Sequence, residues 1–277
     1  MTTDSPPARL ISIPCTVGRA SVGMLVRPDT RDAEIVHEVT RTYGIDALAE
    51  AYRWEQSVTI FDIGAHIGTF SVLIATLLPR AVVYAFEAAP ENAAVLRANV
   101  QHAGLTDRVH PFHAAIGARA GFFATSDIGR SPDAANTGGH SVTGITLYDT
   151  PPHDGRSYAE VLALGPLLDR HSRVDILKID CEGSEFEILY NLSRAQLERV
   201  GTLLGEIHGC VGFAGTTTNG HAWNGTALTD FLRQPFDTVA TSHRVDTDTA
   251  VLETFHATRR QPRGRRAMRM LRHLIGR

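Results

Sequence analysis

The sequence predicts an α/β fold with a mostly parallel central sheet and helices on both of its faces. Between residues 58 and 207, short apolar runs alternate with segments of helical spacing. Most of these runs are continuously apolar, as is typical of parallel strands that are buried on both faces. Ligands of such sheets bind beyond the carboxyl ends of the strands, so the residues that follow each strand are the candidates for function.

The first part of the chain carries two patterns before this alternation begins. Apolar runs at 10–17 and 21–26 flank a glycine, which predicts a hairpin. Residues 32–52 have helical spacing with Gly44 as a break. We therefore expect an N-terminal extension over residues 1–54, made of a hairpin and a helix that pack on the core.

The alternation predicts the elements of a core domain over residues 55–258. Apolar runs predict strands at 58–63, 81–86, 109–115, 174–179, 203–207, 238–241 and 250–258. Helical spacing predicts helices at 69–78, 90–103, 157–170, 184–192 and 227–234. Residues 117–150 are rich in Gly, Ser and Thr and predict a β-like insertion, a hairpin with strands near 122–125 and 141–147.

Charge is unevenly distributed along the chain. Residues 259–277 carry eight arginines and no acid, whereas the rest of the chain carries 30 acidic residues against 19 basic ones. Because an acidic surface repels phosphate backbones, no nucleic-acid partner is expected. Two interpretations of the Arg-rich C-terminal tail, 259–277, stay open: a solvated segment, or one that contacts an anionic surface.

Cysteine usage and hydropathy bear on the compartment. Cys15, Cys181 and Cys210 include no CxxC pair, which argues against a disulfide framework or a zinc site. The first residues lack the pattern of a signal peptide, and the longest apolar run is too short to cross a bilayer. The sequence therefore predicts a cytoplasmic location and no membrane span.

A glycine turn follows the first core strand, in the sequence FDIGAHIGTF. Gly64 permits a tight turn, and Gly68 permits close packing of a helix on a strand. A dinucleotide fingerprint has a further glycine where His66 stands, which weakens the case for a pyrophosphate ligand. Asp62 suits a ligand with a cationic amino group, such as S-adenosylmethionine. A structural turn without a ligand is the alternative at this step.

An acid, Glu87, ends the second core strand. A carboxylate at this place can accept hydrogen bonds from both hydroxyls of a ribose. Its separation from Gly64 is close to the spacing of about 20 residues that dinucleotide folds use. The alternative is an exposed acid favoured by the dipole of the next helix. Together with the glycine turn, the spacing favours ribose binding.

The stretch LKIDCEGSE carries three charged side chains at the end of the strand at 174–179. Lys178 and Asp180 are two residues apart on the strand, so they share one face. A buried lysine needs a partner, which favours a structural ion pair for Lys178. Asp180 stands at the strand tip and Glu182 in the loop beyond, and for these two we favour a functional role.

These three motifs together resemble the FkbM-type S-adenosylmethionine-dependent methyltransferases. The resemblance rests on FDIGAxIG at 61–68, on FExxPxN at 86–92 with Asn99, and on LKIDxEGxE at 177–185. Glu206-Ile207-His208 resembles a trailing ExH of that family. His66 stands where the family usually has Asn, and Ala88 where it often has Pro. The resemblance spans about residues 30 to 210.

The resemblance implies a Rossmann-like methyltransferase fold with S-adenosylmethionine as cofactor. The residues it implies for cofactor binding are Asp62, Gly64, Ala65, His66, Gly68, Thr69, Glu87 and Ala88. It also implies transfer of a methyl group to a small-molecule acceptor, most readily to a hydroxyl of a small molecule, sugar or natural product. The alternatives are N-methylation of a small molecule or peptide, and a nicotinamide-dependent oxidoreductase.

Methyl transfer to a hydroxyl requires removal of a proton at or before attack. The catalytic candidates are Asp180, Glu182 and His208, of which His208 has the most suitable unperturbed pKa for a base near neutral pH. Histidine in a structural network at the strand end is the alternative. A divalent cation is a further option that we do not favour; its ligands would be Asp180, Glu206 and His208.

Overall fold

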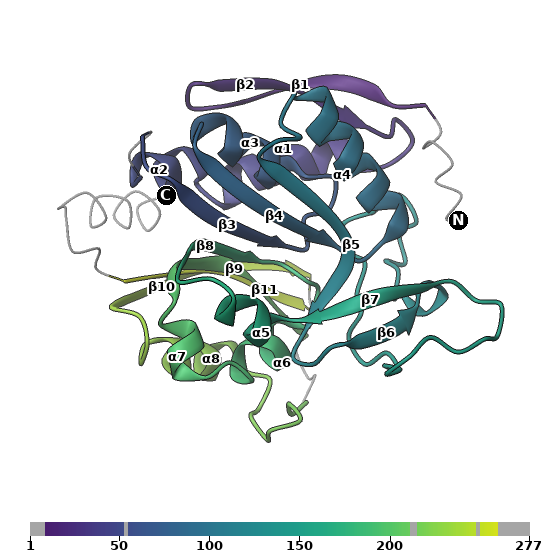
Figure 1. The fold of residues 1–277 in the computed structure, drawn as a ribbon, viewed down its shortest axis with the longest axis vertical. Helices are drawn as coiled ribbons and strands as arrows, with labels where there is room; N and C mark the ends of the chain where they lie inside the picture. The colour runs from purple at the N-terminus through teal and green to yellow at the C-terminus, as the bar shows by residue number, and fades with distance from the viewer. Residues whose placement is uncertain (1–8, 53–54, 211–214, 248–249, 260–277) are drawn as a thin grey trace.

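A nine-stranded sheet forms the centre of the described part of the chain, residues 9–52, 55–210, 215–247 and 250–259 of the computed structural model (Figure 1). Its strands are β3 (Val58–Ile63), β4 (Ala81–Glu87), β5 (Val109–Gly117), β6 (Gly121–Ala124), β7 (Tyr158–Ala163), β8 (Val174–Ile179), β9 (Val200–Cys210), β10 (Thr238–Thr247) and β11 (Ala250–Thr258). Their order is β10-β11-β9-β8-β3-β4-β5-β7-β6.

The centre of the sheet is parallel and its margins are antiparallel. β7, β5, β4, β3, β8 and β9 all run in one direction, whereas β11 is antiparallel to β9, β10 to β11 and β6 to β7. Because the chain moves outward from β3 in both directions, the strand order reverses between β3 and β8. Such a switch point opens a crevice at the carboxyl ends of the strands.

Helices cover both faces of the sheet (Figure 1). One face carries α1 (Asp32–Thr42), α2 (Ile45–Glu50), α3 (Thr69–Leu77) and α4 (Pro90–His102), and the other carries α5 (Leu164–Asp169), α6 (Glu185–Tyr190), α7 (Arg194–Leu197) and α8 (Gly225–Leu232). Each set buries its own apolar cluster against the sheet. The predicted α/β class with a mostly parallel sheet is confirmed. Each helix in the described part of the chain is too short or too polar to cross a lipid bilayer.

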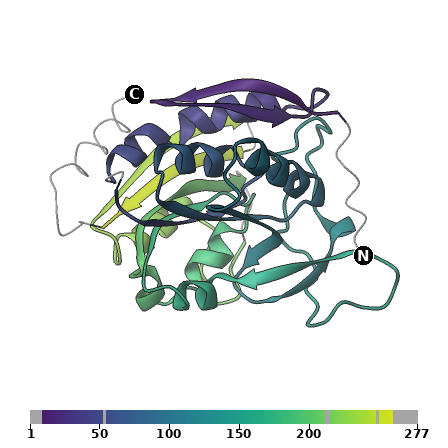
Figure 2. The same cartoon turned by 45° about the horizontal axis from the view of Figure 1, so that its top comes forward.

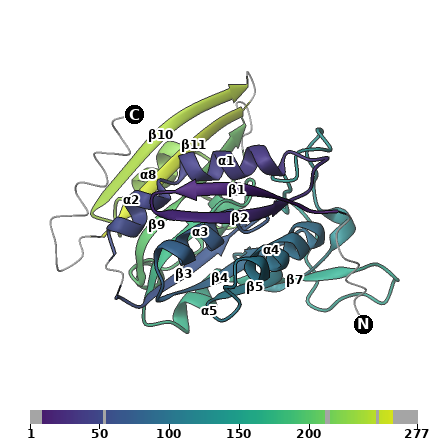
Figure 3. The same cartoon turned by 90° about the horizontal axis from the view of Figure 1, so that it is seen from above.

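The N-terminal segment adds a layer above the first set of helices. The hairpin of β1 (Ile11–Val17) and β2 (Ala20–Val26) lies across α1, α3 and α4, as Figures 2 and 3 show. Its buried side chains join the cluster of that face. The buried amide of Asn99 bonds to Leu25 of the hairpin at both its N–H (2.6 Å) and its C=O (3.0 Å), and it also donates to Ile67 O (2.8 Å). One side chain thus joins the hairpin to the turn after β3.

Two predictions of secondary structure were wrong. Residues 157–170, predicted as one helix, form strand β7 followed by helix α5. Ala159 and Val161 are buried at alternate positions, and β7 gains its hydrogen bonds from β5 and β6, which lie elsewhere in the sequence. Residues 141–147 form no strand either; β6 pairs with β7 instead, so the strand pair of the insertion closes beyond residue 150.

The predicted break at Gly44 is present, with a positive φ of 52° between α1 and α2. The strand predicted at 203–207 extends over the whole of β9, and α7 follows α6 as a separate short helix. A capping box at Ser193 starts α7: its hydroxyl accepts from Gln196 N, and the Gln196 side chain accepts from Ser193 N. The predicted Arg-rich tail, 259–277, lies outside the described residues except for Arg259.

Candidate active site

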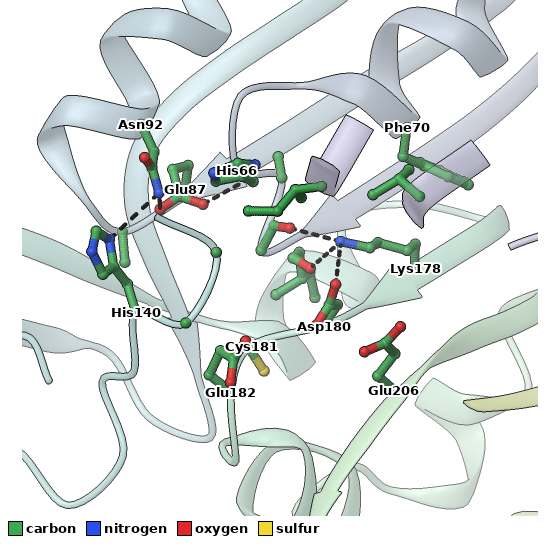
Figure 4. Close-up of a pocket in the computed structure, with 18 of the residues that line it drawn as sticks. His66, Phe70, Glu87, Asn92, His140, Lys178, Asp180, Cys181, Glu182 and Glu206 are labelled. Atoms are coloured by element: carbon green, nitrogen blue, oxygen red, sulfur yellow. Dashed lines mark hydrogen bonds and ion pairs between the residues drawn. The ribbon is translucent and has the colours of Figure 1, made fainter. Parts of the chain in front are cut away.

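A cavity of about 430 Å³ lies at the carboxyl ends of the parallel strands (Figure 4). Its floor consists of residues in the carboxyl-terminal parts of β3, β4, β5, β8 and β9 and in the turns after β3, β4 and β8. Side chains of α1 line one side, among them Ile35, Glu38 and Val39, and residues 136–142 line another. The cavity therefore occupies the place where the strand order predicts a ligand.

The glycine turn after β3 approaches β8 closely. A Cβ on Gly64 would lie 1.6 Å from the carbonyl oxygen of Asp180, and its φ is +71°, so glycine is required here. Gly64 N and Ala65 N both donate to the carbonyl oxygen of Phe86 at the end of β4. The turn thereby presents Gly64, Ala65 and His66 to the cavity. Gly68 lies behind it, where a Cβ would meet Leu96 at 2.4 Å.

Asp62 does not reach the cavity, although the sequence favours a direct contact with the cofactor. Its carboxylate is fully buried, accepts from the Ser71 hydroxyl at 2.6 Å and lies 3.3 Å from Lys178 Nζ. The predicted ion pair of Lys178 is thus present, and it has a second acid, Asp180, at 3.4 Å. Lys178 Nζ also donates to Gly64 O at 2.7 Å. The ammonium therefore fixes the glycine turn against the end of β8 (Figure 4).

Burial lowers the pKa of Lys178, but the charges of Asp62 and Asp180 outweigh it, and its pKa is raised above the usual range. Lys178 is consequently charged at neutral pH. Its ammonium also lies 5.5 Å from the centre of the Tyr43 ring, at cation–π distance. A compact ammonium can meet two carboxylates, a carbonyl and a ring face at once.

Glu87 is held with its carboxylate at the edge of the cavity. One oxygen accepts from His66 N at 2.8 Å, and the other accepts from Ala89 N at 2.9 Å. Burial raises the pKa of Glu87, and these hydrogen bonds only partly offset that effect. Oε1 also accepts from the side-chain amide of Asn92 at 3.4 Å, so Oε2 is the oxygen that keeps a lone pair for a further donor. Glu87 is therefore oriented before any ligand arrives (Figure 4).

Besides its backbone N–H, which donates to Glu87, His66 also forms a hydrogen bond through its ring. Thr137 donates its hydroxyl to Asp32 at 2.6 Å, so at the 2.8 Å contact His66 Nε2 must donate to Thr137. Burial lowers the pKa of His66 to about 4, so the ring is neutral at neutral pH. Asn92 also donates to Thr137 O at 2.9 Å. These bonds fasten the 136–140 loop over the Glu87 end of the cavity.

Asp180 stands where Lys178 and the N-terminal segment meet. Its Oδ2 accepts from the Tyr43 hydroxyl at 2.7 Å and lies 3.4 Å from Lys178 Nζ. Burial raises the pKa of Asp180, but the charges of Lys178 and His208 and the Tyr43 hydroxyl outweigh it and lower the pKa below its usual value. Asp180 is thus an anion whose charge is stabilised at Oδ2 by the Tyr43 hydroxyl and the Lys178 ammonium.

The loop after β8 is organised by the carboxylate of Glu185, which has no exposed surface. One oxygen accepts from Cys181 N at 2.9 Å and from His208 Nδ1 at 2.9 Å, and the other accepts from Gly183 N at 2.9 Å. Glu182, between them, has a φ of +54°, which places its side chain over the cavity. The final Glu of the LKIDCEGSE motif therefore builds the turn and orients the histidine.

His208 lies among four carboxylates. Besides the Glu185 contact, its Nε2 lies 3.5 Å from Glu182, 3.8 Å from Asp180 and 3.8 Å from Glu206. Burial lowers the pKa of His208, but Glu185 and the other acids outweigh it and raise the pKa well above the usual value. Without another cation the ring carries a proton at neutral pH, which argues against its predicted use as a base.

Burial raises the pKa of two carboxylates in this cluster. The pKa of Glu182 rises to about 7, with the charge of Asp180 adding to the effect of burial. The pKa of Glu206 rises to about 8 for the same two reasons. Glu206 is 9% exposed and makes no hydrogen bond among the described residues. It faces the end of β8 from β9 (Figure 4).

The structure brings most of the predicted site residues to one cavity. Those that line it are Gly64, Ala65, His66, Thr69, Glu87, Ala88, Asp180, Glu182, Glu206 and His208. Asp62 and Gly68 lie behind its wall. Sequence reasoning missed Tyr43 and Glu38, because helical spacing does not show which surface a residue faces. Glu185 had a usable signal, its place in the LKIDCEGSE motif.

Fold and site together are those of a Rossmann-like enzyme whose cavity lies at the carboxyl end of a parallel sheet. Residues 62–234 match the model of the family described as "Methyltransferase FkbM domain". The chain is also 30% identical over 195 residues to the 31-O-demethyl-FK506 methyltransferase FkbM of Streptomyces tacrolimicus, which covers 62% of this chain and 75% of that protein. The chain belongs to the FkbM methyltransferase family.

Solved structures with a similar fold match this chain at low sequence identity. The precorrin-6y C5,15-methyltransferase of Geobacter metallireducens has 14% identity and a TM-score of 0.40, covering 78% of this chain and 87% of that one. The N-terminal domain of EvdMO1 with SAH bound has 12% identity and a TM-score of 0.45, covering 78% and 79%. At these TM-scores the likenesses add nothing to the family assignment.

Proposed function

We propose that the protein is an S-adenosylmethionine-dependent methyltransferase that methylates a hydroxyl of a small molecule, sugar or natural product. One observation carries the proposal: a single cavity joins the Gly64 turn and Glu87 at one end to Asp180, Glu182 and Glu206 at the other. Cofactor and proton acceptor can thereby face the same reacting atoms. Membership of a methyltransferase family argues against the alternative of a nicotinamide-dependent oxidoreductase.

We propose one orientation for the cofactor in this cavity. Glu87 accepts the ribose hydroxyls, and the methionine portion lies along the turn from Gly64 to His66. Ala88, Ala115 and Ile116 form an apolar wall where the adenine ring packs. Asp62, which is committed to Lys178, acts by positioning that ammonium and not by touching the ligand.

The acceptor end of the cavity favours an oxygen nucleophile. Three carboxylates there would stabilise the protonated form of an amine, which cannot attack, whereas they can take up the proton of a hydroxyl. Glu182 and Glu206 are the carboxylates whose side chains make no hydrogen bond among the described residues, and Glu206 faces the end of β8 from β9, so we assign the proton acceptor to it. The curated relative is named for O-methylation of FK506, which supports a hydroxyl acceptor.

Two measurements test the proposal. Calorimetry of the full chain should show one binding site for S-adenosylmethionine and one for S-adenosylhomocysteine. If neither compound gives heat of binding and neither competes with the other, the proposed function is wrong. A panel of hydroxylated and aminated acceptors, with S-adenosylhomocysteine release as readout and the methyl position read by NMR, then separates O- from N-methylation. Product methylated only at nitrogen would contradict the assignment of the acceptor.

The same assay tests the residues. Glu206→Gln and Asp180→Asn should each reduce turnover by roughly a hundredfold or more, the range typical of general acid–base groups, with cofactor affinity within threefold of the wild type. Arg130→Gln, a surface change on the 125–157 connection, is the matched control and should retain turnover. If Glu206→Gln has the same turnover as the wild type, Glu206 is not the proton acceptor, and Asp180 or Glu182 takes that role.

A further inference from the structure

Three side chains in the cavity place their ligand atoms close together. One oxygen each of Asp180 and Glu182 and a ring nitrogen of His208 all lie within 4.8 Å of one another. His208 Nε2 makes no hydrogen bond among the described residues, and its carboxylate neighbours lie at 3.5 to 3.8 Å. These separations are too long for strong hydrogen bonds. They also slightly exceed the roughly 3 to 3.5 Å that metal–ligand bonds of about 2.1 Å leave between adjacent ligands, so a bound cation would draw the three side chains inward.

The orientation of His208 is fixed from behind. Its Nδ1 is bonded at 2.9 Å to Glu185, whose carboxylate is fully buried and tied to the backbone of the loop after β8. Histidines that bind metals almost always donate their second ring N–H to a carboxylate or carbonyl in this way. With Nδ1 as the donor, Nε2 points its lone pair toward Asp180 and Glu182.

Glu206 gives a separate indication that a ligand belongs at this place. Its side chain is nine-tenths buried, lines the cavity and makes no hydrogen bond among the described residues. The nearest positive partner is His208 Nε2, at 3.8 Å, and one imidazole cannot satisfy three carboxylates at once. A buried carboxylate without a donor costs free energy unless a ligand that is bound during function supplies one.

We propose that Asp180, Glu182 and His208 hold a divalent cation, with Glu206 beside it. Two carboxylates with one imidazole suit a first-row ion such as Mn²⁺, since Ca²⁺ takes oxygen ligands and purely thiolate sites select other metals. The role of the ion rests on the proposed function: it would bind the acceptor oxygen and make its proton easier to remove. Lys178, on the opposite side of Asp180, keeps that carboxylate ionised for the ion.

The site differs from the set expected from the sequence. Glu182 takes the place of Glu206 among the three ligands, because the positive φ of Glu182 turns its side chain back over the end of β8. A cation held there also explains the arrangement of Ser141 and Thr143, which both donate to the carbonyl oxygen of Glu182 and hold the turn in this strained form.

The test is direct binding of Mn²⁺ to the full chain after treatment with a chelator. Titration calorimetry and the loss of the free Mn²⁺ signal in electron paramagnetic resonance should both give one ion per chain. Asp180→Asn and His208→Gln should weaken binding at least a hundredfold, and Glu185→Gln by about 10- to 100-fold, as for other supports of a metal ligand. Glu34→Gln removes an equal charge from the exposed part of α1, where Glu34 pairs with Arg31, and should change binding less than threefold.

The outcomes separate this site from the cofactor site. S-adenosylhomocysteine binding by the metal-free protein, measured in the same preparation, decides the proposed function without reference to the ion. Absence of Mn²⁺, Mg²⁺ and Zn²⁺ binding to the wild type would overturn the cation site, whatever the variants do. Binding that survives in Asp180→Asn and His208→Gln, with both variants folded by circular dichroism, would place the ion elsewhere and also overturn it.

Discussion

The hydroxyl of Tyr43, at the end of α1, donates a 2.7 Å hydrogen bond to Asp180, at the end of β8. Tyr43 is fully buried and lies outside the region that matches the family model, residues 62–234. The segment before the family domain therefore supplies a direct contact to the centre of the candidate site. Its helix α1 also lines the cavity, so the predicted N-terminal extension is part of the active-site wall.

We predict that Tyr43→Phe removes the donor from Asp180 without changing the shape of the core. A hydrogen bond to a charged group contributes about 1.5–3 kcal/mol, so unfolding by urea should show a loss of that size. Turnover should fall roughly tenfold with cofactor affinity unchanged. Tyr52→Phe is the matched control, because the Tyr52 hydroxyl is also buried but donates to Asp175 O, away from the cavity. Equal loss of turnover in both variants would contradict a specific role of Tyr43.

We predict that Glu87→Ala weakens the binding of S-adenosylhomocysteine. Loss of hydrogen bonds from a ribose to a carboxylate should raise the Kd by about 10- to 100-fold, the equivalent of about 1.5–3 kcal/mol. Titration calorimetry measures it. Glu91→Ala changes an acid one turn further along the chain, at the start of α4, which pairs with Arg130 and does not line the cavity. Its Kd should equal that of the wild type; a similar loss in both would point to a general electrostatic effect.

We predict that Lys178→Met unfolds the protein or destabilises it by about 3–5 kcal/mol, since it leaves the buried Asp62 and the partly exposed Asp180 without their cation. The double variant Asp62→Asn with Lys178→Met should recover part of that loss, as denaturant unfolding would show. Lys178→Arg is the sharper test of function. A planar guanidinium cannot reproduce the contacts with Gly64 O and both carboxylates, so turnover should fall even if the chain folds. Unchanged folding and turnover would mean that lysine is not required.

A fourth prediction concerns pH and His256, a buried histidine of β11. Burial lowers its pKa to about 4, and its Nδ1 has no hydrogen bond among the described residues. Below about pH 6.5, His256 is protonated in the unfolded chain but stays neutral in the folded chain. The free energy of unfolding therefore falls as the pH drops from 7 toward 4. This one group accounts for about 3 kcal/mol. His256→Leu should remove that part of the slope in denaturant titrations; a difference from the wild type that is independent of pH would contradict it.

The sequence was sufficient for most of the fold because its signals are local. Continuous apolar runs marked the buried parallel strands, and glycines marked the turns at Gly44 and Gly64. The wrong prediction of a helix at 158–163 has a physical cause. A six-residue run with few breaks is compatible with a helix or a strand, and pairing with β5 and β6 makes it a strand. Such pairing depends on segments far away in the sequence, which no local pattern reveals.

For the candidate site, too, the sequence predicted what local signals carry and missed what depends on distant segments. Strand ends could be predicted to converge, which placed Glu87, Asp180, Glu182 and His208 in one cavity. The direction of a side chain at the end of a strand could not be predicted, and so Asp62 was assigned to the ligand when it faces Lys178 instead. The raised pKa of His208, a residue of β9, likewise depends on the carboxylates of the loop after β8, which the fold brings beside it.

The position of β8 in the sheet has a consequence for synthesis of the chain. β3, β4 and β5 emerge from the ribosome first and can pair with one another, which already places the Gly64 turn beside Glu87. The other edge of β3 stays open until β8, late in the sequence, inserts beside it. Closure over so long a loop is slow, and an open apolar strand edge is prone to aggregate meanwhile. A nascent chain stalled before β8 would therefore carry the Gly64 and Glu87 half of the site beside an unpaired edge of β3.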